Sequence, residues 1–322
     1  EMPEVCEEPS YAKKSTKEII KSIIAISIPI SISSLVSAVN KSIDSITAVR
    51  GLKTFLSDEI AKFQFGIYTG KVDVLVGLPL SFNIAFATVL VPSISKLMAQ
   101  KKKEDANKVV KFSLLATILI GLPCTFGMMV FAEQILKLLY PNAPEGAQLL
   151  QITSLTIILM MMAQTINGVL QGILIYRVTA TALALGVIAK FILNLILIPI
   201  SSIGINGVAI GSIVCHIISF SIGFAVLKRA MKIKFDVNKF LIKPLLATAI
   251  MCLISYLAYL LLVQFISWKL SAIVAIILAV PIYALAVAIM KILDKEEIYR
   301  LPKGELIYKL LVKMKLYPSE VQ

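Results

Sequence analysis

Long apolar runs separated by short polar segments form the dominant pattern of this chain. Each run is about 20 residues long, enough to cross a hydrocarbon layer of ~30 Å as a helix rising about 1.5 Å per residue. The eight runs lie at about 22–42, 72–95, 110–131, 148–172, 178–199, 205–227, 243–264 and 270–290. The pattern therefore predicts an all-α integral membrane protein with eight transmembrane helices.

Composition and charge support this prediction and give an orientation. Hydrophobic residues make up 58% of the 322 residues, and charged residues only 16%, against about 25% in soluble domains. If the N-terminus is cytoplasmic, the inner segments hold 24 of the 32 Lys and Arg residues and the outer segments seven, five of them in the loop 41–71. This asymmetry follows the positive-inside rule. We therefore expect a cell-membrane protein with both ends cytoplasmic, and the net charge of +13 needs no nucleic acid to explain it.

Patterns for metal binding and for bond-breaking chemistry are missing from the sequence. The four cysteines form no CxxC pair, and the single histidine offers no ligand cluster, so we expect no metal site and no cofactor. The chain also shows no Ser/His/Asp arrangement, no nucleotide-binding loop and no paired catalytic carboxylates. We therefore do not expect an enzyme.

Polar side chains within the first six runs are the candidate functional residues. A charged side chain at the centre of a membrane helix costs about 2.5–3.5 kcal/mol on insertion scales, whereas the last two runs carry almost nothing polar in their middles. The candidate substrate-binding residues are Asn40, Lys41, Asp44, Arg50, Asn83, Gln164, Asn167, Gln171, Lys190, Asn194 and His216.

The strongest of these candidates each have a structural alternative. Gln164, Asn167 and Gln171 share one helix face, which either lines a cavity or holds neighbouring helices by hydrogen bonds worth about 0.6 kcal/mol on average in membranes. Lys190 either faces a cavity or extends to the outer interface. The sequence leaves both questions open.

The remaining charged and titratable candidates also have two interpretations each. His216 is either a satisfied interior histidine or a proton relay. Asp44 and Arg50 either bind substrate or mark the water interface beyond the first run. Export of cations favours a buried carboxylate within a span, and we expect none here because Asp44 and Asp73 lie at span ends.

The expected organisation has four parts. Residues 1–21 form a cytoplasmic linker from a preceding lobe, 22–232 a six-helix lobe, 233–293 two additional transmembrane helices, and 294–322 a cytoplasmic amphipathic tail. The tail either lies flat on the inner leaflet or packs on the protein. A short surface helix is expected over 57–66, with Ser57 as its N-cap.

Several stretches together resemble a known family. These are ISIPISISSLVSAVNKSIDSITAVRGL (26–52), GKVDVLVGLPLSFNIAFATVLVPSISK (70–96), SLLATILIGLPCTFGMMVFAEQILKLLYP (113–141), QTINGVLQG (164–172) and NLILIPISSIGINGVAIGS (194–212). They resemble the stage V sporulation protein B group. That group belongs to the polysaccharide transporter branch of the multidrug/oligosaccharidyl-lipid/polysaccharide flippase superfamily. The resemblance covers nearly the whole chain.

The resemblance implies a full-length protein of fourteen spans, in which two six-helix lobes enclose a central cavity. This chain would be the second lobe plus the last two spans, with the first lobe and membrane lipid as its partners. In related lipid II flippases, arginines of the first lobe grip the pyrophosphate of the substrate.

The function implied is alternating-access flipping of a lipid-linked cell-wall or polysaccharide precursor, such as that of spore-cortex peptidoglycan. The lipid-linked sugar-phosphate substrate requires amides for its sugar and cations for its phosphate. Lys41, Arg50 and Lys190 suit the phosphate. The alternatives are an ion-coupled multidrug or cation exporter of the same superfamily, and a non-transporting scaffold for wall synthesis.

Overall fold

The computed structural model describes residues 15–301, 303–314, 316 and 317, which form helices and no strands. Twelve α-helices and two π-helical turns follow one another along these residues. Their bounds are α1 Thr16–Leu52, α2 Asp58–Ile67, η1 Tyr68–Val72, α3 Asp73–Ala99, α4 Lys103–Val130, α5 Ala132–Leu139, α6 Ala147–Gly172, α7 Arg177–Leu197, α8 Asn206–Met231, η2 Asn238–Ile242, α9 Lys243–Leu262, α10 Trp268–Ile289, α11 Lys295–Tyr299 and α12 Gly304–Lys313.

Seven of the eight predicted spans are confirmed as helices long and apolar enough to cross a membrane. They are α3 together with α2 and η1, then α4, α6, α7, α8, α9 with η2, and α10. The remaining prediction, 22–42, lies within α1, which is 37 residues long but is not among those seven. Its membrane crossing stays a prediction, as does the division into a six-helix lobe and two added helices.

The prediction that residues 41–71 form a loop is wrong, whereas their location on the outer side stays a prediction. α1 continues to Leu52, and only residues 53–57 separate it from α2. The short helix expected over 57–66 is confirmed as α2, and Ser57 Oγ accepts a hydrogen bond from the backbone N of Ile60 at 3.5 Å. The end of the first apolar run at residue 42 therefore marks a change from apolar to polar side chains, while the helix itself continues for a further ten residues.

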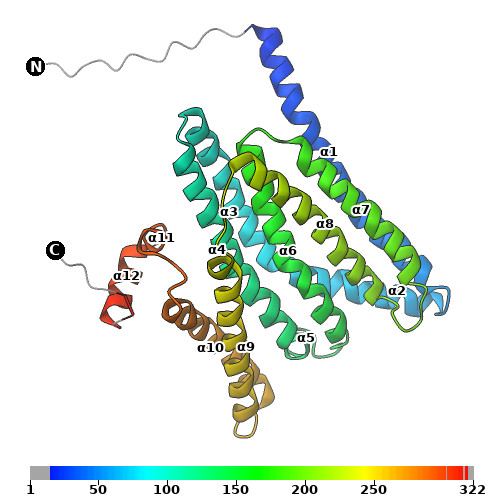
Figure 1. Ribbon diagram of the computed structural model, residues 1–322. Coiled ribbons are helices and arrows are strands. Elements are labelled where there is room, and N and C mark those ends of the chain that lie inside the picture. Colours follow the sequence, from blue (N-terminus) through cyan, green and yellow to red (C-terminus); the bar gives the residue numbers. More distant parts are fainter. Residues whose placement is uncertain (1–14, 302, 315, 318–322) are drawn as a thin grey trace, which may run out of the picture.

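α6 is the central helix of the bundle and packs against α3, α4 and α8 (Figure 1). α7 lies between α8 and α1, and α9 packs on α4 and α10. Two apolar cores meet along α6. One includes Leu150 and Ile157 from its first half, and the other includes Ile166 and Leu170 from its second half.

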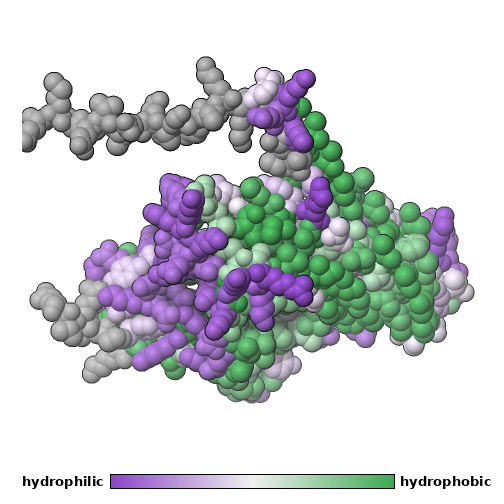
Figure 2. All heavy atoms as spheres, turned by 45° about the horizontal axis from the view of Figure 1, so that its top comes forward, coloured by the Kyte–Doolittle hydropathy of each residue, from purple (hydrophilic) through white to green (hydrophobic). Residues whose placement is uncertain are grey.

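Large apolar side chains also cover much of the outside. Phe82 is 77% exposed on α3 and Val280 is 71% exposed on α10, as expected for helices surrounded by lipid. Figure 2 shows hydrophilic side chains gathered on the left of its view, beside a broad hydrophobic area. The chain is a multi-pass membrane protein.

Glycines allow α7 and α8 to approach closely. A Cβ atom at Gly186 would lie 2.5 Å from the carbonyl oxygen of Cys215, and one at Gly211 would overlap Asn194 Oδ1. Small residues at such contacts let membrane helices gain packing that a hydrophobic driving force cannot supply in lipid.

We expect Gly211→Ala to lower the free energy of unfolding by about 1–3 kcal/mol, the usual cost of overpacking a close contact. Gly77→Ala is the matched control, because a Cβ at Gly77 meets no atom within 4 Å, and we expect it to leave stability unchanged or to raise it slightly. Thermal unfolding in detergent measures both. Equal losses for the two variants would contradict the packing argument.

Candidate functional site

A buried ion pair joins α1 to α7. Lys190 Nζ lies 2.6 Å from Asp44 Oδ2, and the two residues are 2% and 7% exposed. Asn194, one turn further along α7, donates hydrogen bonds from Nδ2 to Asp44 Oδ1 at 3.3 Å and to Thr47 Oγ1 at 3.0 Å. Residues at i and i+4 on α7 therefore meet residues at i and i+3 on α1.

This arrangement bears on two of the candidates. Asp44 lies within α1, well before the end of that helix, and binds Lys190. Its place relative to the membrane stays a prediction. Lys190 neither lines an open cavity nor extends to the interface, since its ammonium is enclosed with the carboxylate.

Further polar groups surround this pair. Tyr68, on η1, and His216, one turn after Ser212 on α8, both lie within electrostatic range of this pair. Asn194 Oδ1 and Ser212 Oγ are buried without a hydrogen-bond partner among the described residues. Four segments that are distant in sequence thus contribute to one polar centre.

A second polar network holds α3, α4 and α6 together. Asn83 Nδ2 donates to the carbonyl oxygen of Met161 and to Gln164 Oε1, both at 3.0 Å. The hydroxyls of Thr117 and Thr165 lie 2.7 Å apart and both approach Asn83 Oδ1 at 3.5 Å. Asn83 is only 4% exposed, so this network serves to hold the three helices together.

The amide-bearing face of α6 is divided between two environments. Gln164 belongs to the network of Asn83, whereas Asn167 and Gln171 are half-buried and make no hydrogen bond among the described residues. Gly168 and Gly172 lie against α3, where added Cβ atoms would be 3.3 Å from Ala87 O and 3.0 Å from Ile94 Cβ. Of this amide-bearing face, only the part with Asn167 and Gln171 is therefore free to contact a ligand.

The other candidates lie along α1 and α8. Lys41 and Arg50 are exposed, and Asn40 is half-buried with Oδ1 unpartnered among the described residues. His216 is half-buried, and the neighbouring Ser212 and Ser219 are buried. The structure thus brings Asp44, Lys190 and Asn194 into direct contact, while Asn83 and Gln164 form a separate contact.

A polar stripe on α1 was missed by the sequence reasoning. Ser27, Ser31, Ser34, Lys41 and Ser45 follow the three- and four-residue spacing of one helix face, and all are exposed. The opposite face carries the residues that are buried or half-buried against α7. The signal was present as the serine spacing in 26–52, but the search for single charged or amide side chains passed over it.

Comparison with known proteins identifies relatives of the chain. The family profile "Lipid II flippase MurJ" matches residues 8–279. The uncharacterized membrane protein YabM of Bacillus subtilis is 29% identical over 62% of this chain and 36% of its own length. The stage V sporulation protein B of the same organism is 22% identical over 79% of this chain and 48% of its own length. The chain therefore spans less than half the length of these curated relatives.

Solved structures show the same fold. An inward closed conformation of lipid II flippase MurJ matches with a TM-score of 0.64 and 18% identity, over 88% of this chain and 57% of that one. An outward-facing multidrug resistance transporter of the MATE family matches with a TM-score of 0.55 and 17% identity, over 94% of this chain and 72% of that one. At this level of identity the two matches speak for the fold alone.

We expect Lys190→Met to lower the free energy of unfolding by about 3–5 kcal/mol, because it leaves the Asp44 charge buried and unpaired. The double variant Asp44→Asn/Lys190→Met should lose less than the sum of the two single variants. Thermal unfolding in detergent of the parent, the two single variants and the double variant measures the coupling free energy between Asp44 and Lys190.

The matched control for this cycle is Lys137→Met. Its partner Glu133 also lies 2.6 Å away, but the two side chains are 47% and 59% exposed, and exposed pairs contribute about 0–1 kcal/mol. Similar losses at Lys137 and Lys190 would contradict the role that we assign to burial.

Proposed function

Since this chain belongs to the lipid II flippase MurJ family, we propose that it forms the second half of a flippase that carries a lipid-linked cell-wall or polysaccharide precursor across the membrane. The first half would be a further six-helix lobe of the same protein. Both ends of this chain would be cytoplasmic, because that orientation places most basic residues on the inner side. The two lobes would rock about a shared cavity to open it to each side in turn.

The observation that carries this proposal is the exposed polar stripe of α1. Four serines and Lys41, spread over nineteen residues from Ser27 to Ser45, point away from the bundle, and side chains of this kind are poorly placed against hydrocarbon. Ser34 Oγ donates to the carbonyl oxygen of Ile30 at 3.2 Å. A water-filled cavity between two lobes would hydrate the rest of the stripe, which the proposal assigns to the cavity wall.

α3 would supply the facing part of the wall. An added Cβ atom at Gly77 meets nothing within 4 Å, and Ser81, one turn later on the same side, is exposed. This small and polar surface is joined to the stripe on α1 through α2. A sugar-bearing headgroup fits such a surface because small side chains leave room and hydroxyls offer hydrogen bonds.

The candidate residues then have two different roles. Lys41 and Arg50 are exposed cations suited to phosphate, and Asn167 and Gln171 are unpaired amides suited to sugar hydroxyls. The buried pair of Asp44 and Lys190 would hold α1 in position without touching substrate. The network of Asn83 and Gln164 would do the same for α3.

We expect Lys41→Gln to reduce flipping of the lipid-linked precursor roughly tenfold to a hundredfold, since a hydrogen bond to a charged group contributes about 1.5–3 kcal/mol. Asn167→Leu should reduce it as well. The measurement is the appearance of precursor on the outer face of cells that depend on the full-length protein, with the amount of each variant in the membrane determined alongside.

Lys62→Gln serves as the matched control for Lys41→Gln. Lys62 is an exposed lysine on α2 whose partner is Asp58, also exposed, and we expect flipping to remain unchanged. If Lys41→Gln and Asn167→Leu both support normal flipping, the cavity wall assigned here is wrong.

The second candidate is an ion-coupled exporter, and one observation favours it. Asp44 is a buried carboxylate within a helix, which is the feature that sequence reasoning expected to be absent. Its charge is already balanced by Lys190, which argues against an exchangeable cation at that oxygen.

We expect the full-length parent protein to show no drug efflux, and therefore no change in efflux in the Asp44→Asn variant. Efflux in the parent that disappears in this variant would establish the exporter instead.

A further inference from the structure

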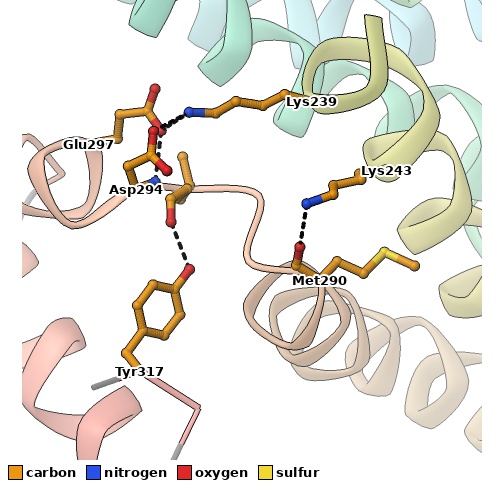
Figure 3. A network of polar contacts seen from close by, with 7 residues as sticks. Lys239, Lys243, Met290, Asp294, Glu297 and Tyr317 are labelled. Carbon is orange, nitrogen blue, oxygen red and sulfur yellow. Dashed lines mark hydrogen bonds and ion pairs between the residues drawn. The ribbon is translucent and has the colours of Figure 1, made fainter. Parts of the chain in front are cut away.

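The C-terminal tail is fastened to the transmembrane part by a set of polar contacts (Figure 3). Lys239, on η2, binds Asp294 at 2.5 Å and Glu297 at 2.8 Å. The hydroxyl of Tyr317 donates to the carbonyl oxygen of Leu293 at 2.7 Å. α11 and α12 are therefore held beside the end of α10.

An apolar groove of about 560 Å³ lies between α10 and this tail. Its walls include Pro281 and Leu285 from α10, and Leu310, Leu311 and Met314 from the tail. From Pro281 to the end of α10 at Ile289 the helix rises about 12 Å, which is most of one ~15 Å leaflet of a ~30 Å hydrocarbon layer. The α10 wall of the groove therefore extends over most of a leaflet, and its apolar lining suits an acyl chain.

α12 presents three different surfaces around its axis. Gly304 and Tyr308 are buried against the protein, whereas Leu306 and Leu310 are 62% and 58% exposed. Glu305, Lys309 and Lys313 occupy the third side by helical spacing. A helix with protein, hydrocarbon and water on successive sides belongs at the membrane interface.

The charges around the groove favour a negative headgroup. Lys291, Lys303 and Lys313 are exposed and form no ion pair among the described residues. Asp294 and Glu297 are engaged by Lys239, and Glu305 binds Lys309 at 2.7 Å. Basic residues near a membrane surface are attracted to anionic lipids, and these three lysines lie just after α10 and at the two ends of α12, so they favour a charged lipid over a zwitterionic one.

We propose that the groove between α10 and α12 binds an anionic phospholipid of the surrounding membrane. The acyl chain lies along α10, and the headgroup lies among the lysines that border α12. The tail thereby acts as a lipid-binding element distinct from the polar surfaces assigned to the substrate. This inference does not depend on the proposed flipping activity.

The test uses tryptophan fluorescence, since Trp268 is the single tryptophan of the chain. In a Trp268→Phe background, Leu285→Trp places the fluorophore in the groove, and Ile277→Trp places it on the same helix outside it. The protein is reconstituted in phosphatidylcholine vesicles that contain increasing fractions of brominated phosphatidylglycerol or of brominated phosphatidylcholine. Met314→Trp provides a second reporter from the opposite wall, in case Leu285→Trp fails to fold.

In the groove, we expect brominated phosphatidylglycerol to reach half-maximal quenching at a several-fold lower mole fraction than brominated phosphatidylcholine. The ratio should be close to one for Ile277→Trp. Combining Leu285→Trp with Lys291→Gln, Lys303→Gln and Lys313→Gln should bring the ratio in the groove to one as well. Equal quenching by the two lipids in the groove reporters, or no quenching by either, would overturn the proposal.

Discussion

Polar groups set in hydrocarbon must find partners within the protein, and this constraint governs how the helices are joined. The contact between Lys190 and Asp44 shows it most clearly. α1 packs mainly on α7 and α2, and Ala48 and Leu52 near its end belong to an apolar core. A charge pair with hydrogen bonds from Asn194 adds a directional link, and its high cost of separation in a low dielectric gives α1 one preferred register against α7.

The same constraint separates polar residues into those that join helices and those that face outward. Asn83 and Gln164 meet each other, so their amides are satisfied inside the bundle. The serines of α1 are not enclosed by this chain. Moving a hydrophilic headgroup through a membrane requires both kinds of polar residue. The first kind holds the helices in a rigid arrangement, and the second kind keeps the surface along the path hydrated.

Much of the fold could be predicted from the sequence because apolar length and helix rise are nearly sufficient to locate a membrane helix. The first helix was the exception. Its run of apolar residues ends near residue 42, but hydrogen bonding along the backbone continues to Leu52, and polarity alone gives no sign of that. The partners in the site were harder to predict still. Lys190 and Asp44 are 146 positions apart, and a periodic pattern shows which face a side chain occupies without showing which helix will lie opposite.

The link from Lys239 to Asp294 and Glu297 also has a mechanical consequence for α9 and α10. It connects the beginning of the first of these helices to the segment just after the second, so the hairpin is closed at its open end. Two helices fastened in this way cannot splay independently. When the bilayer thickens or thins, the pair must accommodate the mismatch by tilting as a single body, carrying the tail with it.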